Sequence, residues 1–502
     1  IYALASIALF FLLTLFQSKP ELDLFLRSGR LLDSNWMKEG WFLPWQNLLQ
    51  LIAPDIFGNP STLNYWGVWN YGEFIGYIGA AGIMLASVAI FFGKKKIFVW
   101  KASLLILLLF TLPNPISKLI YQLNTPLISS LQPTRLMGMI DFVLVLLAVF
   151  GIGILTKLKA REVNKLSVLW IIFIIGIWLS LLIFIVNSSG TLADNLEISK
   201  RNLILPTILI FSNLTFFNLL ARIKKEKYKR IVVLSIIAIS IFDLFRFGWK
   251  FTPFTPKDLF FPSTKIISYL SSQKKPFRIM TLDDKILPAN SNAYYGIESV
   301  SGYDPIILFR YEEFIASVER GKPNIDKPFG FNRIINPKNY KSPLLPLLNV
   351  KYLLTLDEVG EDGFDLVMEE GRSKVYKNEN YLPRVFMVSE VINIFDNQQT
   401  IDRLYQSGFD LKTQAIVDGH VAIGKKEFDP SEKIVILSYK GDKIEFQTSI
   451  ITDRFVVITN SYDLGWKAYV NGKEVKVYRT DYAFCGILVP QGVKKIEFIY
   501  KP

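Results

Sequence analysis

The amino-acid sequence predicts a polytopic α-helical membrane bundle, followed by an extracytoplasmic α+β region that ends in a small antiparallel β-sandwich. Long apolar runs alternate with short polar loops up to about residue 250, and no later run reaches the roughly 20 residues that span a bilayer. After residue 428, short strand-like runs follow each other, separated by turns with Gly, Asn or Pro. We therefore expect a transmembrane domain over 1–250, an extracytoplasmic linker and α/β region over 251–350, a small α+β domain over 351–427 and the β-sandwich over 428–502.

About seven apolar segments form the predicted transmembrane domain. They are 1–16, 74–92, 97–112, 137–155, 167–186, 203–220 and 231–247. The first residue is Ile1 and not Met, and it lies inside an apolar run. We therefore expect an N-terminally truncated chain, from which the residues upstream of Ile1 have been left out.

Three densely basic loops predict how the bundle is oriented, because short loops rich in Lys and Arg mark the cytoplasmic side of a membrane protein. They are GKKKIFVWK (93–101), TKLKAREVNK (156–165) and RIKKEKYKR (222–230). The basic loops occupy every second connection, so everything after about residue 250 is predicted to lie outside the cytoplasm. Much of the +13 net charge lies in these loops, so the charge indicates orientation and not a nucleic-acid partner.

The first predicted outer loop is rich in tryptophan, a residue that prefers the membrane–water interface. Its members are Trp36, Trp41, Trp45, Trp66 and Trp69. The stretch 44–58 predicts a short helix along the outer surface, ended by Pro54 and Gly58. Two interpretations stay open: simple interfacial anchoring, or one wall of an outward-facing cavity whose aromatic faces contact a sugar ring or a lipid tail.

Ionisable residues at membrane depth are costly and often mark a functional site. Arg135 stands at the predicted outer mouth of one helix, with Asp141 a turn or two inside, and Glu73 opens another helix. Asp243 and Arg246 are spaced to pair on one helix face. These residues can all be paired or snorkelling interfacial side chains. The functional alternative is a substrate site formed by Arg135, Asp141, Glu73, Trp66 and Trp69, in which the guanidinium holds the phosphate of a lipid.

Motifs of soluble cofactor and metal enzymes are missing from the sequence. It contains no GxxxxGK[ST], HExxH or CxxC motif, and no GxSxG that follows a strand. A single histidine, His420, and a single cysteine, Cys485, make a multi-histidine metal site or an internal disulfide impossible. We expect no metal ligands and no cofactor, and a substrate that is lipid-linked or extracellular.

The stretch SYDLGWKAYVNGKEV (461–475) predicts a β-hairpin in the C-terminal sandwich. Asn471-Gly472 is the strongest two-residue turn signal, and it interrupts an alternation of apolar and polar residues. Trp466 shares one face with Ala468 and Val470. This alternation favours Trp466 as a core residue over Trp466 as an exposed sugar-binding platform.

Several motifs together resemble the YfhO family of bacterial membrane proteins, which belongs with the C-type (GT-C) glycosyltransferases. In chain order they are APDIFG with the following YWG, the E-x-x-x-Y-x-G of Glu73, Tyr77 and Gly79, QPTR, SGYDPIILFRYEEF, LNVKYLLT, NENYLPRVFMV, SYDLGWKAYVNGKEV and LVPQGVKKIEFIYKP. They extend from about residue 53 to the C-terminus. Each motif alone is weak, and their order is fairly specific.

This resemblance implies a multi-pass glycosyltransferase of the bacterial cytoplasmic membrane. It would take a sugar from a polyprenyl-phosphate carrier and transfer it, outside the cytoplasm, to a cell-envelope polymer or glycolipid. In similar enzymes, a catalytic acidic residue usually lies in an outer loop near the N-terminus of the protein. We expect this region to lie upstream of Ile1, so no residue here is assigned as the catalytic base. The family's pattern often has a second arginine where this chain has Gln132. A non-enzymatic envelope assembly or polysaccharide-binding protein and a lipid or polymer transporter stay open as alternatives.

Overall fold

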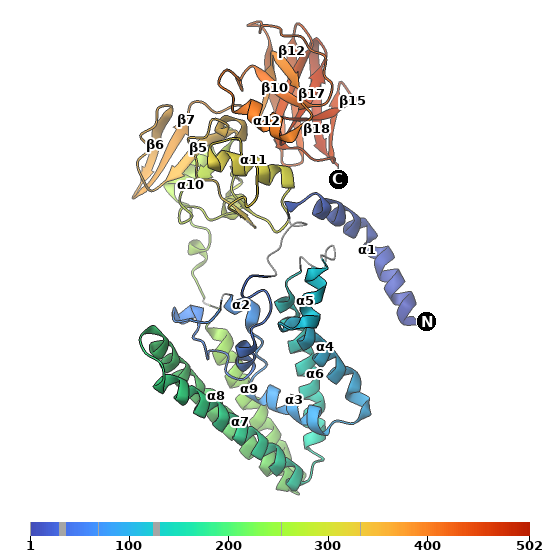
Figure 1. Ribbon diagram of the computed structural model, residues 1–502, viewed down its shortest axis with the longest axis vertical. Coiled ribbons are helices and arrows are strands. Elements are labelled where there is room, and N and C mark those ends of the chain that lie inside the picture. The colour runs from blue at the N-terminus through green and yellow to red at the C-terminus, as the bar shows by residue number, and fades with distance from the viewer. Residues whose placement is uncertain are drawn as a thin grey trace. The chain divides into compact units, whose positions relative to one another are not determined.

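The structure is a computed structural model that describes residues 2–29, 37–68, 70–123, 131–252, 254–331 and 333–501. The chain forms two compact units (Figure 1). We call residues 33–255 the helical unit, and residues 1–32 together with 256–502 the strand-rich unit. The predicted transmembrane domain over 1–250 thus loses its first helix to the other unit. The Gly29 amide donates to the Ile307 carbonyl, and the Phe309 amide donates to the Arg27 carbonyl.

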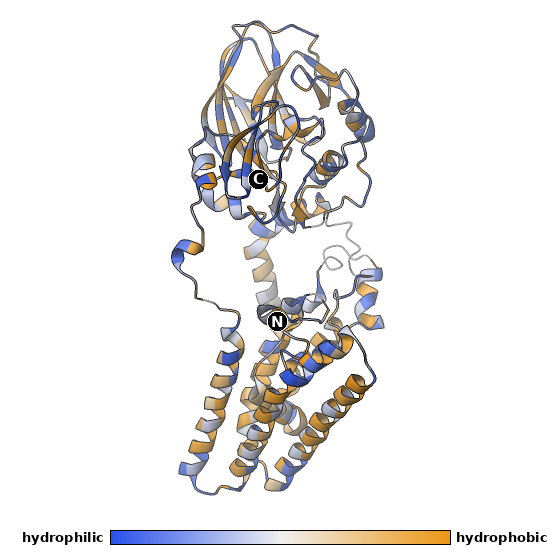
Figure 2. Cartoon of the chain, turned by 90° about the vertical axis from the view of Figure 1, so that its left-hand side faces the viewer, coloured by the Kyte–Doolittle hydropathy of each residue, from blue (hydrophilic) through white to orange (hydrophobic). Residues whose placement is uncertain are grey.

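The helical unit contains four helices long and apolar enough to cross a membrane, among the residues that the structure describes. They are Pro133–Leu155, which includes α6 (Met137–Leu155), α7 (Ala160–Val186), α8 (Thr191–Arg222) and α9 (Glu226–Trp249). A fifth span arises if α4 (Phe98–Thr111) and α5 (Pro115–Gln122), bent by 59°, count as one. Their mostly hydrophobic colouring is clear in Figure 2.

The number of spans is lower than the seven predicted segments, because the second predicted segment, 74–92, is interrupted. Its helical part, α3 (Ala80–Phe92), has only 13 residues, and the preceding α2 (Tyr71–Phe74) has 4. Residues 75–79 between them are irregular. The first predicted segment, 1–16, lies in α1 (Tyr2–Leu26), which belongs to the strand-rich unit.

Close packing of α3 against α6 forms the centre of the helical unit. A Cβ atom on Gly151 would lie 1.9 Å from the carbonyl oxygen of Leu85, so only glycine allows this approach. Small residues at helix contacts serve this purpose in membrane proteins, where the hydrophobic effect between helices is weak. Gly153, two residues further along α6, has nothing within 4 Å of its Cβ position.

Gly151→Leu is expected to destabilise the protein by at least about 3 kcal/mol, since the new side chain must displace backbone and not a flexible side chain. Gly153→Leu is the matched control, with the same change on the same helix, and should leave stability nearly unchanged. Thermal unfolding of the full chain in detergent measures both variants. Equal melting temperatures for the two variants would contradict the packing described here.

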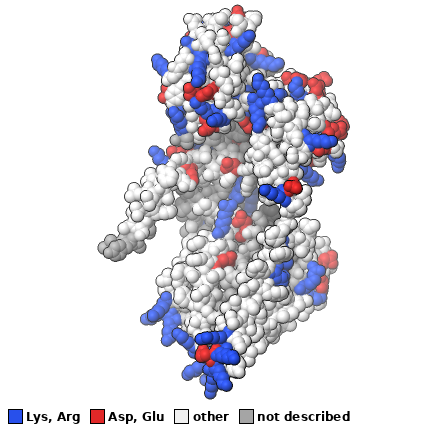
Figure 3. Space-filling view, turned by 180° about the vertical axis from the view of Figure 1, so that it is seen from behind, with Lys and Arg blue, Asp and Glu red and all other residues white. Residues whose placement is uncertain are grey.

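The connections rich in lysine and arginine gather at one end of the helical unit (Figure 3). Phe92, Leu155, Leu158 and Ile223, which lie in or beside these three connections, pack in one apolar cluster. The basic α6–α7 connection follows the C-terminal end of α6, and the η7 turn (Pro133–Leu136) precedes its N-terminal end. In the same way, the basic α8–α9 connection precedes α9, and Lys250 follows its C-terminal end. The helical unit therefore has a basic end and an opposite end.

The strand-rich unit begins with α1 and contains two sheet assemblies. The first is a five-stranded sheet in the order β2-β1-β5-β7-β6, in which β1 is parallel to β2 and β5. Its strands are β1 (Arg278–Thr281), β2 (Glu298–Ser299), β5 (Val350–Thr355), β6 (Phe364–Glu370) and β7 (Ser373–Asn378). A two-stranded sheet, β3 (Gly302–Tyr303) with β4 (Ile334–Ile335), and the helices α10 (Lys265–Ser272) and α11 (Phe309–Arg320) accompany it.

The second assembly is a β-sandwich of two sheets, in the orders β8-β13-β17-β16-β10-β9 and β11-β12-β18-β14-β15. The first sheet comprises β8 (Val385–Val388), β9 (Glu390–Asn393), β10 (Gln414–Asp418), β13 (Arg454–Ser461), β16 (Val477–Thr480) and β17 (Phe484–Val489). The second comprises β11 (Lys433–Lys440), β12 (Lys443–Ile450), β14 (Trp466–Val470), β15 (Lys473–Val475) and β18 (Gly492–Tyr500). The helix α12 (Asn397–Leu404) lies between β9 and β10 in the sequence. The predicted boundary at residue 428 therefore cuts through one sheet, since β8, β9 and β10 precede it.

The predicted hairpin is present in the second sheet of the sandwich. Asn471 and Gly472 both have positive φ angles, 49° and 82°, as a type I′ turn requires. Trp466 stacks on Phe498 with ring centroids 4.3 Å apart, and its indole nitrogen donates to the Ser461 carbonyl at 3.2 Å. Trp466 thus packs at the edge of the sandwich core, as its position in the alternation predicts.

Candidate functional site

The candidate site lies in the helical unit, around residues 71–80. This segment carries the carboxylate of Glu73 and lies beside two others, Asp141 of α6 and Asp243 of α9. Glu73 belongs to α2, a single turn that Asn70 caps by accepting from the Gly72 amide at 3.0 Å. We predicted a continuous helix that begins at Glu73. The structure shows an interrupted one, because the backbone leaves the helical conformation at Ile75.

Glu73 and Arg135, two of the predicted substrate-binding residues, lie side by side. The nearest atoms, Arg135 Nε and Glu73 Oε1, are 3.9 Å apart, and Thr134 donates from its hydroxyl to Glu73 Oε2 at 3.4 Å. The Arg135 side chain remains 59% exposed. Such a long, exposed pair contributes little stability, so most of the guanidinium N–H groups stay available to a ligand.

Asp141 approaches the same segment from α6. Its Oδ1 atom lies 2.6 Å from where a Cβ on Gly76 would stand, so a larger residue at position 76 would have to displace the Asp141 side chain. This oxygen is buried and has no hydrogen-bond partner among the described residues. The structure therefore places Asp141 beside the segment that begins at Glu73.

Asp243 of α9 holds the start of α3. Its Oδ2 atom accepts from the Ala80 amide at 2.9 Å and from the Tyr77 hydroxyl at 2.7 Å. Gly79, with φ +83°, offers no side-chain cap of its own. The predicted pair between Asp243 and Arg246 is wrong: the described residues show no ion pair between them, because the carboxylate faces the end of α3 instead.

A second buried carboxylate, Asp55, closes the loop that precedes α2. It accepts from Asn59 Nδ2 at 2.7 Å and from the Tyr71 hydroxyl at 3.4 Å, and it forms an ion pair with Lys250. Burial and the negative charge of Asp55 both raise the pKa of Tyr71. Asp55 and Lys250 thus tie the loop to the end of α9. Asp55 stands in the APDIFG motif, and no local pattern relates it to Lys250, which lies 195 positions later.

Trp66 lines an apolar cavity of about 740 Å³ between this loop and the helices α7 and α8. Its ring meets the ring of Phe57 at 5.1 Å between centroids. Leu49, Phe173, Ile177, Leu181 and Leu196 are among the other lining residues. The loop had two interpretations, interfacial anchoring and one wall of an outward-facing cavity. The position of Trp66 in the cavity lining agrees with a cavity wall. Trp69 lies outside the described residues.

The predicted surface helix over 44–58 is only a short 3₁₀ helix, η3 (Trp45–Leu51), followed by turns. Gly58 has φ +80°, and a Cβ there would lie 2.0 Å from the Asn64 carbonyl oxygen, so the chain turns back sharply. Leu49 of η3 lines the cavity, whereas Leu48 and Leu51 pack in the cluster that contains Phe74 and Met137. The η3 helix therefore separates the cavity from the neighbours of Glu73 and Arg135.

The arrangement suits a ligand with an anionic head and an apolar body. Arg135 offers exposed donors in the fork geometry that matches phosphate, and the cavity on the other side of η3 is lined mainly by apolar side chains. No group of three or more His, Cys, Asp or Glu side chains is arranged to hold a metal ion in the described part of the chain.

Comparisons with known proteins agree on one region. Residues 425–502 match the model of the family described as "Bacterial membrane protein YfhO". Through this C-terminal segment, the chain is similar to the YfhO family. The "Uncharacterized protein YfhO" of Bacillus subtilis (strain 168) is 31% identical over 72 residues, which are 14% of this chain and 8% of that protein. No solved structure matches the chain.

The YfhO match covers strands β11 to β18 and includes the hairpin motif at 461–475. The helical unit and its motifs, APDIFG and QPTR among them, lie outside the matched segment. The match therefore covers most strands of the sandwich and no residue of the candidate site, which is argued from its geometry alone.

Asp243→Ala is expected to lower stability by about 2 kcal/mol, because it leaves the Ala80 amide and the Tyr77 hydroxyl without their acceptor. Asp243→Asn keeps an acceptor oxygen in place and should cost less than about 1 kcal/mol. Thermal unfolding in detergent compares the two variants. If both variants lose the same stability, the carboxylate oxygen does not act as the cap of α3.

Proposed function

We propose that this protein is a glycosyltransferase of the bacterial cytoplasmic membrane. It moves a sugar from a polyprenyl-phosphate carrier to a cell-envelope polymer or glycolipid on the extracytoplasmic side. The observation on which this proposal depends is the exposed guanidinium of Arg135 at the end of α6 opposite the basic connections.

The sidedness of the proposal follows from charge. Exposed lysines and arginines concentrate at the α3–α4, α6–α7 and α8–α9 connections, which the positive-inside rule assigns to the cytoplasm. Arg135 and the end of α9 then face the other side. A nucleotide sugar from the cytosol would not reach this side, so a lipid-linked donor is the consistent choice.

The apolar cavity beside Trp66 is the proposed place for the first isoprene units of the carrier. Each CH₂ group removed from water contributes about 0.8 kcal/mol, so a few isoprene units supply substantial binding free energy. The phosphate would then lie toward Arg135, across η3 from the cavity.

The reaction breaks the bond between the anomeric carbon and the phosphate oxygen, and forms a bond from that carbon to an acceptor hydroxyl. A carboxylate takes the hydroxyl proton, and cations stabilise the departing lipid phosphate. Arg135 is proposed for the phosphate, with Glu73 and Thr134 as the groups that position it. Asp141 and Trp66 complete the proposed substrate site, and the identity of the base is left unassigned.

A lipid or polymer transporter is the second candidate, favoured by the interruption of the α2–α3 segment at residues 75–79. Transporters bind substrates at such broken helices. The two functions are separated by reconstituting the protein in vesicles with a radiolabelled polyprenyl-phosphate sugar. Label that crosses the membrane without leaving the lipid indicates transport, and label that moves to the acceptor fraction indicates transfer.

Arg135→Ala is expected to reduce sugar transfer from a polyprenyl-phosphate donor by at least about 100-fold, since a charge-assisted phosphate contact is lost. Arg135→Lys should retain part of the activity, because the charge remains and the bidentate fork does not. Arg201→Ala, a change at an exposed arginine of α8, serves as the matched control and should transfer normally. Undiminished transfer by Arg135→Ala would remove this residue from the site.

Gly176→Phe tests the cavity. Gly176 lines it and has nothing within 4 Å of its Cβ position, so phenylalanine would fill the cavity without a backbone clash. We expect KM to rise about tenfold for long-chain donors and little for a donor with two isoprene units, which loses less buried area.

The control for the cavity is Gly153→Phe, the same change at an exposed glycine of α6 that does not line the cavity. Its kinetics should match those of the unaltered protein with both donors. A Gly176→Phe variant that handles both chain lengths normally would show that the lipid lies elsewhere.

A further inference from the structure

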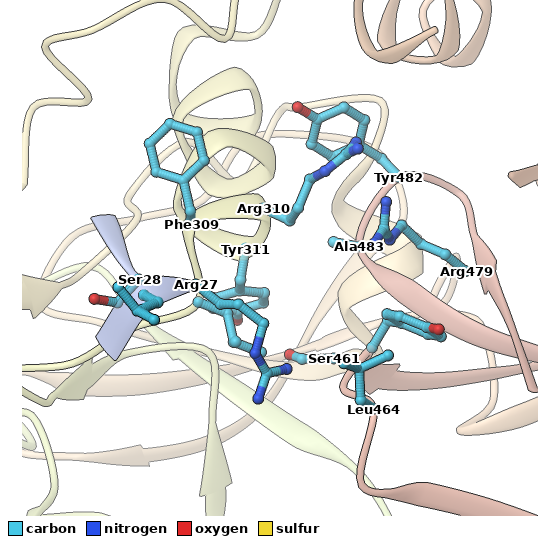
Figure 4. Close-up of a pocket in the computed structure, with 13 residues that line it drawn as sticks. Arg27, Ser28, Phe309, Arg310, Tyr311, Ser461, Leu464, Arg479, Tyr482 and Ala483 are labelled. Atoms are coloured by element: carbon cyan, nitrogen blue, oxygen red, sulfur yellow. The ribbon is translucent and has the colours of Figure 1, made fainter. Parts of the chain in front are cut away.

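A second cavity, of about 340 Å³, lies within the strand-rich unit and contains three arginines (Figure 4). They are Arg27 from the end of α1, Arg310 from α11 and Arg479 from β16. Tyr311, Tyr462 and Tyr482 also line it, and none of its lining residues is acidic. We call this cavity the arginine pocket. Its volume falls in the range of small-ligand sites, which is roughly 300–1,000 Å³.

Two of the three arginines have carboxylate partners outside the pocket lining. Arg27 bonds to Asp463 at 2.5 Å, and Arg479 bonds to Asp418 at 2.9 Å. Arg310 forms no ion pair among the described residues, and its guanidinium carbon lies 5.0 Å from the centroid of the Tyr482 ring. Two of the three positive charges are therefore balanced by carboxylates outside the pocket lining, and the charge of Arg310 has no ion-pair partner among the described residues.

Aromatic rings orient two of these guanidinium groups. Arg310 lies over Tyr482, and Arg479 lies over Tyr462 at 5.1 Å from the ring centroid. Stacking uses the face of the guanidinium plane and leaves the N–H groups at its edge available for a bidentate contact. Figure 4 shows Arg310 and Arg479 on the same side of the pocket as Tyr482.

The turn that presents Tyr482 is held in an unfavourable backbone conformation. Asp481 and Tyr482 have φ angles of +46° and +76°, a region that costs a bulky residue about 1–3 kcal/mol. Two contacts maintain it: Asp481 exchanges hydrogen bonds with the Ile416 backbone at 2.8 Å, and the Tyr482 hydroxyl donates to Glu313 at 2.7 Å. A strained backbone persists only where surrounding contacts hold it in place. Here these contacts fix the position of the Tyr482 ring beneath Arg310.

We propose that the arginine pocket binds an anionic saccharide, through a phosphate or carboxylate held by Arg310 and Arg479 and a sugar ring held against the tyrosines. The cations select the charge, and the aromatic faces accept the C–H surface of a sugar. This inference does not depend on the proposed glycosyl transfer, because binding at the pocket requires no residue of the helical unit.

Isothermal titration of the full chain, in nanodiscs of zwitterionic lipid, tests the pocket with three soluble probes. The probes are glucose 1-phosphate, glucuronate and methyl glucoside. Both anionic probes should bind at least about tenfold more tightly than the neutral one, because hydrogen bonds to charged groups contribute about 1.5–3 kcal/mol. Equal affinity for all three would overturn the proposal.

Arg310→Gln should weaken glucose 1-phosphate binding about 10- to 100-fold. The matched control is Arg372→Gln, at an exposed arginine of the β6–β7 turn that does not line the pocket. Cys485 is the single cysteine and is fully buried in the sandwich, so slow labelling by a thiol reagent confirms that each variant is folded. A folded Arg310→Gln protein with unchanged affinity would contradict the assignment.

Leu464 gives a second test that spares the arginines. It lines the pocket but is 65% exposed, so a charged side chain there should not disturb folding. Leu464→Glu is expected to weaken glucose 1-phosphate binding several-fold by repulsion, and Leu464→Lys is expected not to weaken it. The same loss in both variants, or none in either, would place the anion elsewhere.

The source of the anionic group is distinguished by changing the lipid. Nanodiscs that contain phosphatidylglycerol should compete with glucose 1-phosphate if the pocket accepts a lipid head group, and Arg310→Gln should abolish that competition. Unchanged glucose 1-phosphate affinity in these nanodiscs assigns the pocket to a glycan that extends from the membrane. Either outcome is compatible with an anion bound by the arginines. The comparison of glucose 1-phosphate and glucuronate with methyl glucoside tests whether the pocket prefers an anion at all.

Discussion

The helical unit depends on one carboxylate, Asp243, that accepts from a backbone amide and a tyrosine hydroxyl where a helix is interrupted. Residues 75–79 leave the helical conformation inside an apolar bundle, where an unpaired N–H group is costly. Asp243 accepts from Ala80 and Tyr77, so α3 can begin at Ala80 and the preceding residues can pass close to α6. Glu73 and Gly76 reach Arg135 and Asp141 because of this interruption.

Among the described residues, each candidate site contains an arginine without a close ion pair. The carboxylate beside Arg135 is 3.9 Å away, and a carboxylate near Arg310 accepts a hydrogen bond from a tyrosine. Arg135 is 3.9 Å from Glu73, which also accepts from Thr134. Arg310 lies near Glu313, which accepts from Tyr482, and burial raises the pKa of this carboxyl. A guanidinium with incomplete partners retains donors for a phosphate or carboxylate ligand. The two sites lie in different units, so they can be tested independently.

Local patterns predicted the elements whose geometry is local. The Asn471-Gly472 turn, the strands of the sandwich and the ordering of basic loops follow from residue type and spacing within about ten residues. The continuous helix through Glu73 and the pair between Asp243 and Arg246 were wrong for one reason. The sequence around 75–79 is apolar enough to be helical, and the carboxylate that stabilises its interruption comes from α9, more than 160 positions later.

Residue types and their spacing are enough to predict that apolar helices precede a β-sandwich, and which loops carry the positive charge. These properties depend on apolar length, alternation and charge, which any fold of the chain must accommodate. Contacts between distant side chains depend instead on the tertiary fold. Arg27, Arg310 and Arg479 come from three distant segments, and no spacing rule relates them. The same holds for Asp55 with Lys250, since long-range packing, and not local preference, sets the distance between side chains that are far apart in the chain.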